Sequence, residues 1–537
     1  MEPVSYSPYI EDRVQQLGKS LLKTIRGDTH PPGWLDGLVT RAIQDRDFRV
    51  QTLRFVDVMP MLVHDAELVA HLQEYFDGIE LPWPGISNWG LRHSDAPWAV
   101  HVAAPLVRTT LRGLSRRFMG GSNIRQALNT ITRLRGQGMH VTLDLLGEAV
   151  ISETEADYYQ RAYLDLLASL HSAGQADATG VRPNVSLKLS SLYSQISPLE
   201  PGGSIEGIGK RLRPILAAAR DYDACVTIDM EQYDFHDIVL QCFMSILMEP
   251  DFRDWPHAGI ALQTYLRNGK QVLQQLVDWA TLRGTPVQVR LVRGAYWDYE
   301  TVIARQQGWA TPVWEHKAQT DAEFETCLKL LFAEHHIVKP AVATHNIRSV
   351  ACALALAEQH QLTADDFEFQ LLYGMADNLK HALVEAGHPV RVYVPYGKTL
   401  PGMAYLVRRL LENTSGQTIL DTGMAYDDPD VDCLQRPMPH IPENDSAAGN
   451  GFRNLPVFRF TDEKERRAFR DSITAVRTDL GQDYPLYING TAVSDAGQII
   501  SRNPAYPNDI IGTVAAANRS HADQAVAAAQ AALPAWR

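Results

Sequence analysis

Three basic residues are the first candidates for chemistry, because their positions would bring them to one site. Lys188 ends a short apolar run, and Arg408 and Arg409 lie on an otherwise apolar, helix-like stretch. An interior lysine needs a negative partner, since burying a bare ammonium costs several kcal/mol. Asp229 on the next run, or a bound carboxylate, would supply it. Guanidinium groups bind carboxylates through paired hydrogen bonds, so we expect a small acid as ligand. The alternative is a solvated arginine pair with Glu412 one turn away.

A second set of residues suits a bound cofactor. Residues 290–297 (RLVRGAYW) end one run with two arginines, a glycine and two aromatic side chains. Residues 344–346 (THN), Gln263 and Gln370 end three other runs. Glycine lets the backbone approach a ligand closely, and arginine neutralises phosphate or an electron-rich ring. His345 taken alone is more often a core histidine with its hydrogen bonds satisfied.

Several other kinds of site find no support in the sequence. No second histidine or cysteine has metal-ligand spacing to His345, and the five cysteines form no CxxC pair, so we expect no metal. There is no GxGxxG after a strand, no P-loop and no GxSxG elbow. With 50 basic against 63 acidic residues the net charge is −13, which disfavours nucleic acid as a partner. Without an apolar leader or a spanning segment, we expect a cytoplasmic protein.

The elements that would position these residues are short strands alternating with helix-length segments. We predict eight strands, at residues 140–145, 185–190, 226–230, 260–263, 287–292, 341–345, 367–372 and 390–394. Eight strand–helix units of this size predict an α/β fold, a (β/α)₈ TIM-type barrel. An open, doubly wound sheet is the alternative fold.

The strands have one apolar and one polar face, as side chains alternate along a strand. Val226 and Ile228 alternate with Thr227 and Asp229. The same alternation places further polar residues on the second face: Ser186, Lys188, Gln288, Arg290, Arg391 and Tyr393. Because the charged residues fall near the carboxyl ends of the strands, we expect them at the mouth of the barrel, where such barrels have their active sites.

The remaining sequence divides into flanking segments. We expect a helical arm or dimerisation region at 1–100, the barrel at 101–420, an acidic, proline-rich linker with a charged helix at 421–480, and a tail at 481–537. The charged helix should span 462–478 with Thr461 as its cap. In the tail, Asn489-Gly490 predicts a hairpin turn and 520–533 an alanine-rich helix. The tail offers too little apolar surface to pack well by itself.

Four motifs together resemble a known family. Residues 290–297, 344–346, 369–375 (FQLLYGM) and 405–412 (YLVRRLLE) closely resemble the FAD-dependent proline dehydrogenase barrel, over roughly residues 130 to 415. With its helical arm, the chain resembles the N-terminal half of the bifunctional proline utilization A family. The tail, including Asn503-Pro504-Ala505, resembles more weakly the beginning of that family's NAD-dependent aldehyde dehydrogenase half, so NAD would serve only that half.

The resemblance implies roles for the substrate-binding residues. Lys188, Arg408 and Arg409 would clamp the carboxylate of L-proline. Asp229 would pair with Lys188, and Glu148 would form a gating ion pair with Arg408. Further residues would surround the substrate ring: Tyr393 and Leu372 along its side, and Tyr296 as a cover near the flavin.

The resemblance also implies a noncovalent FAD site. Arg290 would reach flavin N5 and Gln263 the pyrimidine edge. The rest of FAD would be bound by Met230, Ala261, Val292, Arg293, Gly294, Ala295, Trp297, Thr344, His345, Asn346, Gln370, Arg409 and Glu412. Lys317 and Thr320 match the pattern less closely, because the spacing after residue 292 differs from it.

The implied reaction is hydride transfer from proline C5 to flavin N5, which gives 1-pyrroline-5-carboxylate. A membrane quinone would then take the electrons, so we expect peripheral contact with the inner face of the membrane. A homo-oligomer is also compatible with the helical arm. Two alternatives stay open: another (β/α)₈ flavin reductase, and a non-catalytic barrel that binds a small acid.

Overall fold

The computed structural model contains two compact units, Met1–Val457 and Phe458–Arg537. The residues that it describes are 7–27, 45–58, 61–62, 64–79, 104–105, 108–109, 117–147, 149–175, 182–397, 433–437, 454, 457–493 and 497–537.

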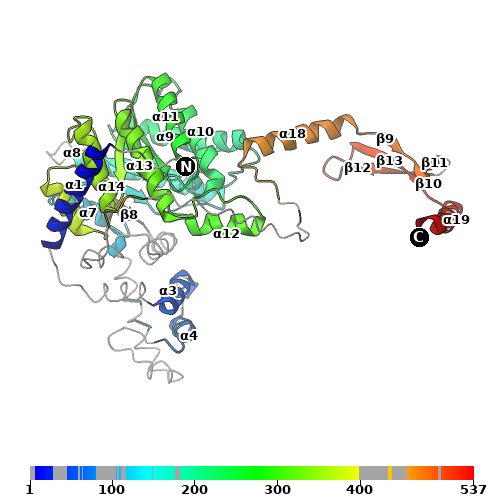
Figure 1. Cartoon of the computed structure of the whole chain (residues 1–537), viewed down its shortest axis with the longest axis horizontal. Helices are drawn as coiled ribbons and strands as arrows, with labels where there is room; N and C mark the ends of the chain where they lie inside the picture. Colours follow the sequence, from blue (N-terminus) through cyan, green and yellow to red (C-terminus); the bar gives the residue numbers. More distant parts are fainter. Residues whose placement is uncertain are drawn as a thin grey trace. The chain divides into compact units, whose positions relative to one another are not determined.

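The first unit is built on a closed barrel of eight parallel strands, which are neighbours in chain order (Figure 1). They are β1 (His140–Leu145), β2 (Asn184–Leu187), β3 (Cys225–Ile228), β4 (Ala258–Gln263), β5 (Val287–Val292), β6 (Val338–Ala343), β7 (Glu368–Leu372) and β8 (Val390–Tyr396). Each predicted strand overlaps one of these, so the (β/α)₈ prediction is confirmed and the open sheet is excluded. The ends differ: β2 stops at Leu187, where a 3₁₀ turn follows, and β6 begins three residues earlier than predicted.

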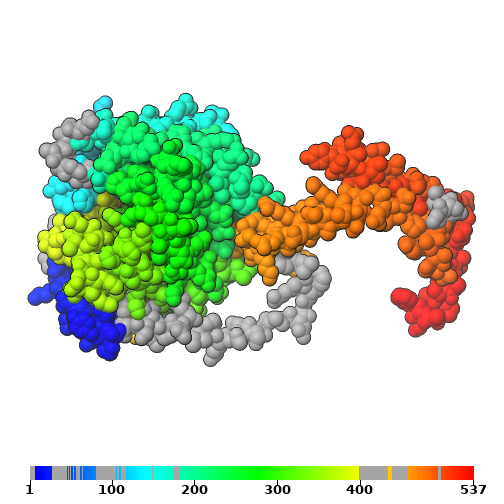
Figure 2. All heavy atoms as spheres, turned by 90° about the horizontal axis from the view of Figure 1, so that it is seen from above, coloured from blue at the N-terminus to red at the C-terminus, as the bar shows by residue number. Residues whose placement is uncertain are grey.

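Helices cover the outside of the barrel (Figure 1), and Figure 2 shows the atoms of this unit closely packed on the face in view. They are α8 (Glu153–Gln175), α9 (Pro201–Asp221), α10 (Tyr233–Ile246), α11 (Gly269–Arg283), α12 (Trp297–Gln307), α13 (Lys317–Ala333), α14 (Ile347–Gln359) and α15 (Asp377–Glu385). Helix α7 (Ile124–Arg135) precedes the barrel and packs against β1 and β8. The Asn123 side chain caps α7 by accepting a hydrogen bond from the Gln126 amide.

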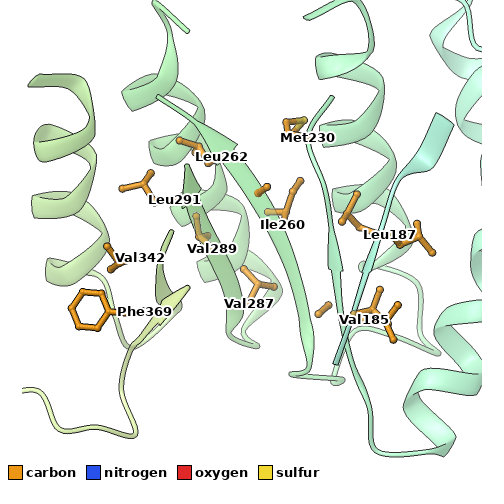
Figure 3. Packing of buried hydrophobic residues seen from close by; sticks show 14 of the residues in the cluster. Val185, Leu187, Met230, Ile260, Leu262, Val287, Val289, Leu291, Val342 and Phe369 are labelled. Atoms are coloured by element: carbon orange, nitrogen blue, oxygen red, sulfur yellow. The ribbon is translucent and has the colours of Figure 1, made fainter. Parts of the chain in front are cut away.

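The strands are apolar on their outer face and polar on their inner face. Figure 3 shows apolar side chains of β2, β4, β5, β6 and β7 between the strands and the helices, and Val287, Val289 and Leu291 are fully buried there. The polar residues line the barrel interior. Polar residues also occur at the other end of this interior, because Glu368 and Arg391 form an ion pair at the starts of β7 and β8. The expectation that Arg391 lies at the mouth is therefore wrong: it lies at the floor.

The amino-terminal segment is helical where it is described, with α1 (Pro8–Gly27), α3 (Arg46–Val58) and α4 (Asp65–Tyr75). Helix α1 packs against α14 and α15 of the barrel shell. Arg348 anchors it, because this buried guanidinium binds both Glu11 of α1 and Glu325 of α13. The arm is thus attached to the barrel through a desolvated charge cluster, not only through apolar packing.

The second unit contains α18 (Glu463–Thr478), five strands and α19 (Arg519–Trp536). The strands are β9 (Gln482–Tyr484), β10 (Leu486–Ile488), β11 (Thr491–Val493), β12 (Gly497–Arg502) and β13 (Ile510–Ala516). The predicted turn at Asn489-Gly490 joins β10 to β11, with both residues at positive φ. The cap of α18 is Asp462, not Thr461, since the Asp462 carboxylate accepts from the Lys464 amide. All residues of β9 and β12 are exposed.

Candidate active site

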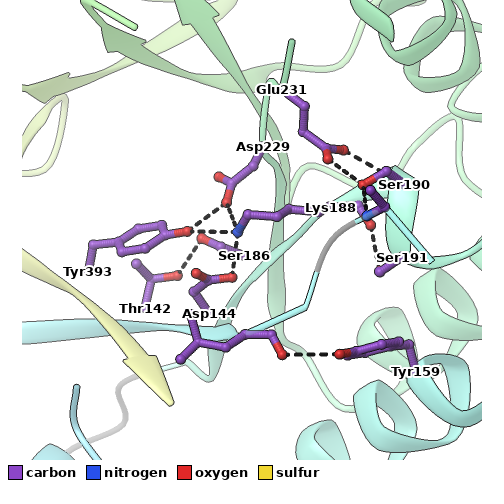
Figure 4. A network of polar contacts seen from close by, with 12 residues as sticks. Thr142, Asp144, Tyr159, Ser186, Lys188, Ser190, Ser191, Asp229, Glu231 and Tyr393 are labelled. Carbon is purple, nitrogen blue, oxygen red and sulfur yellow. Dashed lines mark hydrogen bonds and ion pairs between the residues drawn. The ribbon is translucent and has the colours of Figure 1, made fainter. Parts of the chain in front are cut away.

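The centre of the polar interior is the ammonium group of Lys188, which follows directly after β2. It donates to Asp144 Oδ1 at 2.7 Å, to Asp229 Oδ2 at 3.2 Å and to Tyr393 Oη at 3.3 Å (Figure 4). An ammonium has three N–H groups, so all of them have a partner here. The predicted pairing of Lys188 with Asp229 is confirmed, and the structure adds a second carboxylate.

Asp229 is the point at which two basic residues, Lys188 and Arg290, and the hydroxyl group of Tyr393 meet. Its carboxylate binds Lys188 on one oxygen and the guanidinium of Arg290 on the other, and the Tyr393 hydroxyl donates to it at 2.7 Å. Burial would raise the pKa of Asp229, but Lys188 and Arg290 outweigh this, so its pKa is lowered. The carboxylate is therefore ionised and keeps both cations in place.

Asp144 is a site residue that was not predicted from the sequence. It lies on β1, fully buried, and burial raises its pKa although Lys188 acts in the opposite direction. The signal was present: Thr142 and Asp144 form the polar face of β1 in the same alternation that identified the other strands. Two buried carboxylates with oppositely shifted pKa values thus share one ammonium.

Arg290 connects this centre with β2 and β7. Its Nε donates to Gln370 Oε1 at 2.6 Å, and its Nη2 donates to Ser186 Oγ at 2.8 Å. Its guanidinium carbon also lies 5.2 Å from the centre of the Tyr393 ring. The predicted residues Arg290, Gln370 and Tyr393 are therefore in one contact network.

The end of β4 has an unused hydrogen-bond acceptor. Gln263 donates through Nε2 to the backbone carbonyl of Glu231 at 3.1 Å, while its buried Oε1 has no partner among the described residues. Near it, Gly294 has φ +126°, and a Cβ there would lie 2.5 Å from the ring of Tyr265. A flavin has a ring N–H that can donate to Gln263, and the glycine lets the backbone after β5 lie directly against the Tyr265 ring. These residues fit FAD.

Two basic residues form a separate cluster after β5. Arg293 binds Asp321 Oδ1 at 2.7 Å and donates to Thr344 Oγ1 at 2.6 Å, and Lys317 binds the other Asp321 oxygen at 2.8 Å. Burial would raise the pKa of Asp321, but Arg293 and Lys317 lower it. Asp321 is a second residue that was not predicted from the sequence. Two cations beside the start of α13 suit the phosphates of a dinucleotide.

The other predicted residues lie close to these groups or outside the described part. His345 Nε2 accepts a hydrogen bond from the Leu372 amide, and Asn346 caps α14. Further predicted residues lie in β4 or β5, in the segments that follow β3 and β5, or at the start of α12: Met230, Ala261, Val292, Ala295, Tyr296 and Trp297. Thr320 lies in the first turn of α13. Glu148, Arg408, Arg409 and Glu412 are outside the described residues.

Gly294→Ala should weaken the binding of added FAD, because the new methyl group would collide with Tyr265 in a backbone conformation that alanine rarely adopts. We expect at least about a tenfold weaker flavin affinity, as measured by fluorescence titration. Gly284→Ala is the control, since Gly284 also has positive φ (+78°) but open space around the new Cβ. Both variants should unfold at lower temperature, and equal flavin affinity in the two would contradict the steric argument.

Two negative findings concern the described residues only. Within those ranges, no three His, Cys, Asp or Glu side chains are grouped so that they could hold a metal ion. No described helix combines the length and the apolar composition that crossing a membrane requires.

Comparison with protein families gives two matches. The model of the proline dehydrogenase family matches residues 127–421, more than half of the chain. The model of the proline utilization A N-terminal domain matches residues 11–118.

Individual relatives agree with these family matches. The bifunctional protein PutA of Escherichia coli (strain K12) is 30% identical over 461 residues, which are 80% of this chain and 35% of that protein. Proline dehydrogenase of Deinococcus radiodurans is 30% identical over 322 residues, 59% of this chain and 92% of that protein. A crystal structure of proline utilization A from Bdellovibrio bacteriovorus, inactivated by N-propargylglycine, is similar with a TM-score of 0.88 and 32% identity, over 98% of this chain and 54% of that chain. The chain thus spans about a third to a half of the two PutA relatives.

Proposed function

The chain belongs to the proline dehydrogenase family, and on this premise we propose that it oxidises L-proline to 1-pyrroline-5-carboxylate with a noncovalent FAD. The observation that carries the proposal is the buried network of Lys188, Asp229 and Arg290, beside the unused acceptor of Gln263. A barrel with this interior has adjoining sites for a small carboxylate and for a flavin.

The charges in the buried network around Lys188 determine which further groups are needed to bind the substrate carboxylate. Lys188 and Arg290 carry two positive charges, and Asp144 and Asp229 two negative ones when both are ionised. Such a network has little net attraction for an anion, and Lys188 has no N–H group left over. The carboxylate of proline therefore needs Arg408 and Arg409 in addition, and Lys188 binds it by exchanging its longest hydrogen bond, the one to Tyr393.

The remaining residues hold the reacting groups in position. Gln263 and Arg290 would bind the flavin ring, and Arg293 with Lys317 its phosphates. Tyr393 and Leu372 would line the side of the proline ring, and Tyr296 would cover it. FAD, when bound, supplies the acceptor for the hydride that leaves proline C5. The protein contributes orientation and a dry, charge-balanced pocket around that carbon.

We further propose the organisation and partners of the longer protein. The segments are an arm at 1–100, the dehydrogenase barrel at 101–420, a linker at 421–480 and, at 481–537, the beginning of an aldehyde dehydrogenase domain that uses NAD. A membrane quinone would reoxidise the flavin, which implies a cytoplasmic protein in peripheral contact with the membrane. The arm would also provide the contact for a homo-oligomer, and light scattering of the purified protein measures the mass of the assembly.

The decisive experiment is anaerobic reduction of the purified protein. It should carry an oxidised flavin spectrum that L-proline bleaches in the absence of oxygen. A flavin that stays oxidised with proline but is bleached by NADH would instead favour a different flavin reductase. A colourless protein that binds no added FAD would favour a barrel that only binds small acids.

A further inference from the structure

The barrel floor holds a buried ion pair for which the proposed reaction has no use. Arg391 at the start of β8 binds the Glu368 carboxylate at the start of β7, with Nε and Nη2 each 2.9 Å from an oxygen. Arg391 also donates to the backbone carbonyl of Val141 at 3.1 Å. Both side chains lie in the interior at the end of the barrel away from Lys188. A buried ion pair adds little net stability, because the desolvation of the two charges offsets most of their attraction, so stability alone does not account for this pair.

A short chain of hydrogen bonds joins this pair to the centre of the site. Gln370 donates through Nε2 to Glu368 Oε1 at 2.7 Å, and its Oε1 accepts from Arg290 Nε at 2.6 Å. Gln288 also donates to Glu368, at 3.2 Å. The chain therefore runs from the floor through one amide to the guanidinium that also binds Asp229.

The direction of the Gln370 amide follows from the charge of Glu368. An ionised carboxylate only accepts hydrogen bonds, so the NH₂ group of Gln370 must face it and the carbonyl oxygen must face Arg290. The pKa of Glu368 is lowered, because Arg391 outweighs the effect of burial, and the carboxylate is ionised at neutral pH. A neutral residue at 368 would allow the Gln370 amide to turn its NH₂ group toward Arg290. Two hydrogen-bond donors would then face each other, and the hydrogen bond between Gln370 and Arg290 would be lost.

We propose that Glu368, held by Arg391, is a positioning residue for the reaction: it orients Gln370 so that Arg290 is fixed toward Asp229 and the flavin. The inference rests on the proposed function for the identity of the group that Arg290 serves. It does not make Glu368 a catalytic residue, since the carboxylate acts only through Gln370.

The test compares Glu368→Gln with Glu325→Gln. Glu325 also forms an ion pair with a buried arginine, Arg348, and this pair is even less exposed than that of Glu368 and Arg391, but it lies on the helices outside the barrel. Each substitution removes one carboxylate from a buried pair and should lower the unfolding temperature. We expect only Glu368→Gln to change the visible spectrum of the bound flavin, weaken FAD binding and lower kcat by about tenfold, with a much smaller effect on KM for proline.

Glu368→Asp keeps the inference testable if Glu368→Gln does not fold. It retains the charge and draws the carboxylate back from Gln370, so the same spectral change and loss of kcat should appear in weaker form. Wild-type flavin spectrum, FAD affinity and kcat in a folded Glu368 variant would overturn the inference. The wild type is the internal standard: a wild-type flavin that proline does not bleach refutes the proposed function, whereas bleaching with unchanged Glu368 variants refutes the positioning role alone.

Discussion

Lys188→Met should lower kcat/KM for L-proline by about 100- to 1,000-fold, because the substitution removes the cation that joins Asp144 to Asp229 and that we propose to bind the substrate carboxylate. Hydrogen bonds to charged groups contribute about 1.5–3 kcal/mol each, and a buried charge left without its partner costs about 3–5 kcal/mol. Since about 1.4 kcal/mol corresponds to a factor of ten, losses of this size give the expected range. Steady-state kinetics with a quinone analogue as acceptor measure it.

The control for Lys188→Met is Lys339→Met. Lys339 is also a strand lysine, on β6, but it is exposed near the start of its strand and lies beside Gln288 in the register. Methionine there should leave kcat/KM within about twofold of the wild type, as is usual for surface substitutions. A Lys188→Met enzyme as active as Lys339→Met would remove Lys188 from the substrate site.

Asp229→Asn should be far more damaging than Asp144→Asn, although both substitutions are isosteric and both residues are buried. The Asp229 carboxylate accepts from Lys188, Arg290 and Tyr393, and an amide presents an NH₂ group to one of these donors. We expect a loss of about 3–5 kcal/mol in the free energy of unfolding and a strong reduction in kcat/KM. Thermal unfolding and proline kinetics on both variants test the contrast.

The pH dependence of stability separates the two carboxylates further. The folded-state pKa of Asp144 is raised, so the folded protein retains a proton that the unfolded chain has lost above pH 3.8. The free energy of unfolding of the wild type therefore falls as pH rises from 3.8 to the raised pKa of Asp144. Over the same pH range, Asp144→Asn should become more stable relative to the wild type. For Asp229 the folded-state pKa is lowered, so its contribution is present above pH 3.8 and is lost only as pH falls below that. Parallel pH dependence of the two variants would contradict the assignment.

The strands and the polar face of the barrel could be predicted from the sequence because both are local properties. Alternation of Thr227 and Asp229 with two apolar residues already defines which side of β3 faces a core. The same reasoning applies to Asp144, whose place in the alternation of β1 is equally clear. The caps show the limit of local reasoning: Asp462 and Thr461 are both good capping residues, and only the backbone path decides between them.

Depth along the barrel axis could not be predicted from alternation. Arg391 and Tyr393 share a face of β8, yet Arg391 lies at the floor with Glu368, while Tyr393 reaches Lys188 and Asp229. The stagger between neighbouring strands sets this depth, and it depends on how all eight strands close. Asp321 could not be predicted either, because its partner Arg293 lies 28 positions away in the chain, on the other side of α12.

The sequence by itself determined the eight strand–helix units, their two-faced strands, the family resemblance and the pairing of Lys188 with Asp229. Alternating hydrophobicity and short motifs carry that information within a few residues of chain. Only the tertiary structure decided that Asp144 shares the Lys188 ammonium, that Gln263 keeps an acceptor unused by the described residues, and that Gln370 joins Glu368 to Arg290 by hydrogen bonds. The contacts between strands join residues that are as many as 250 positions apart in the chain, and closure of the barrel is what brings them together.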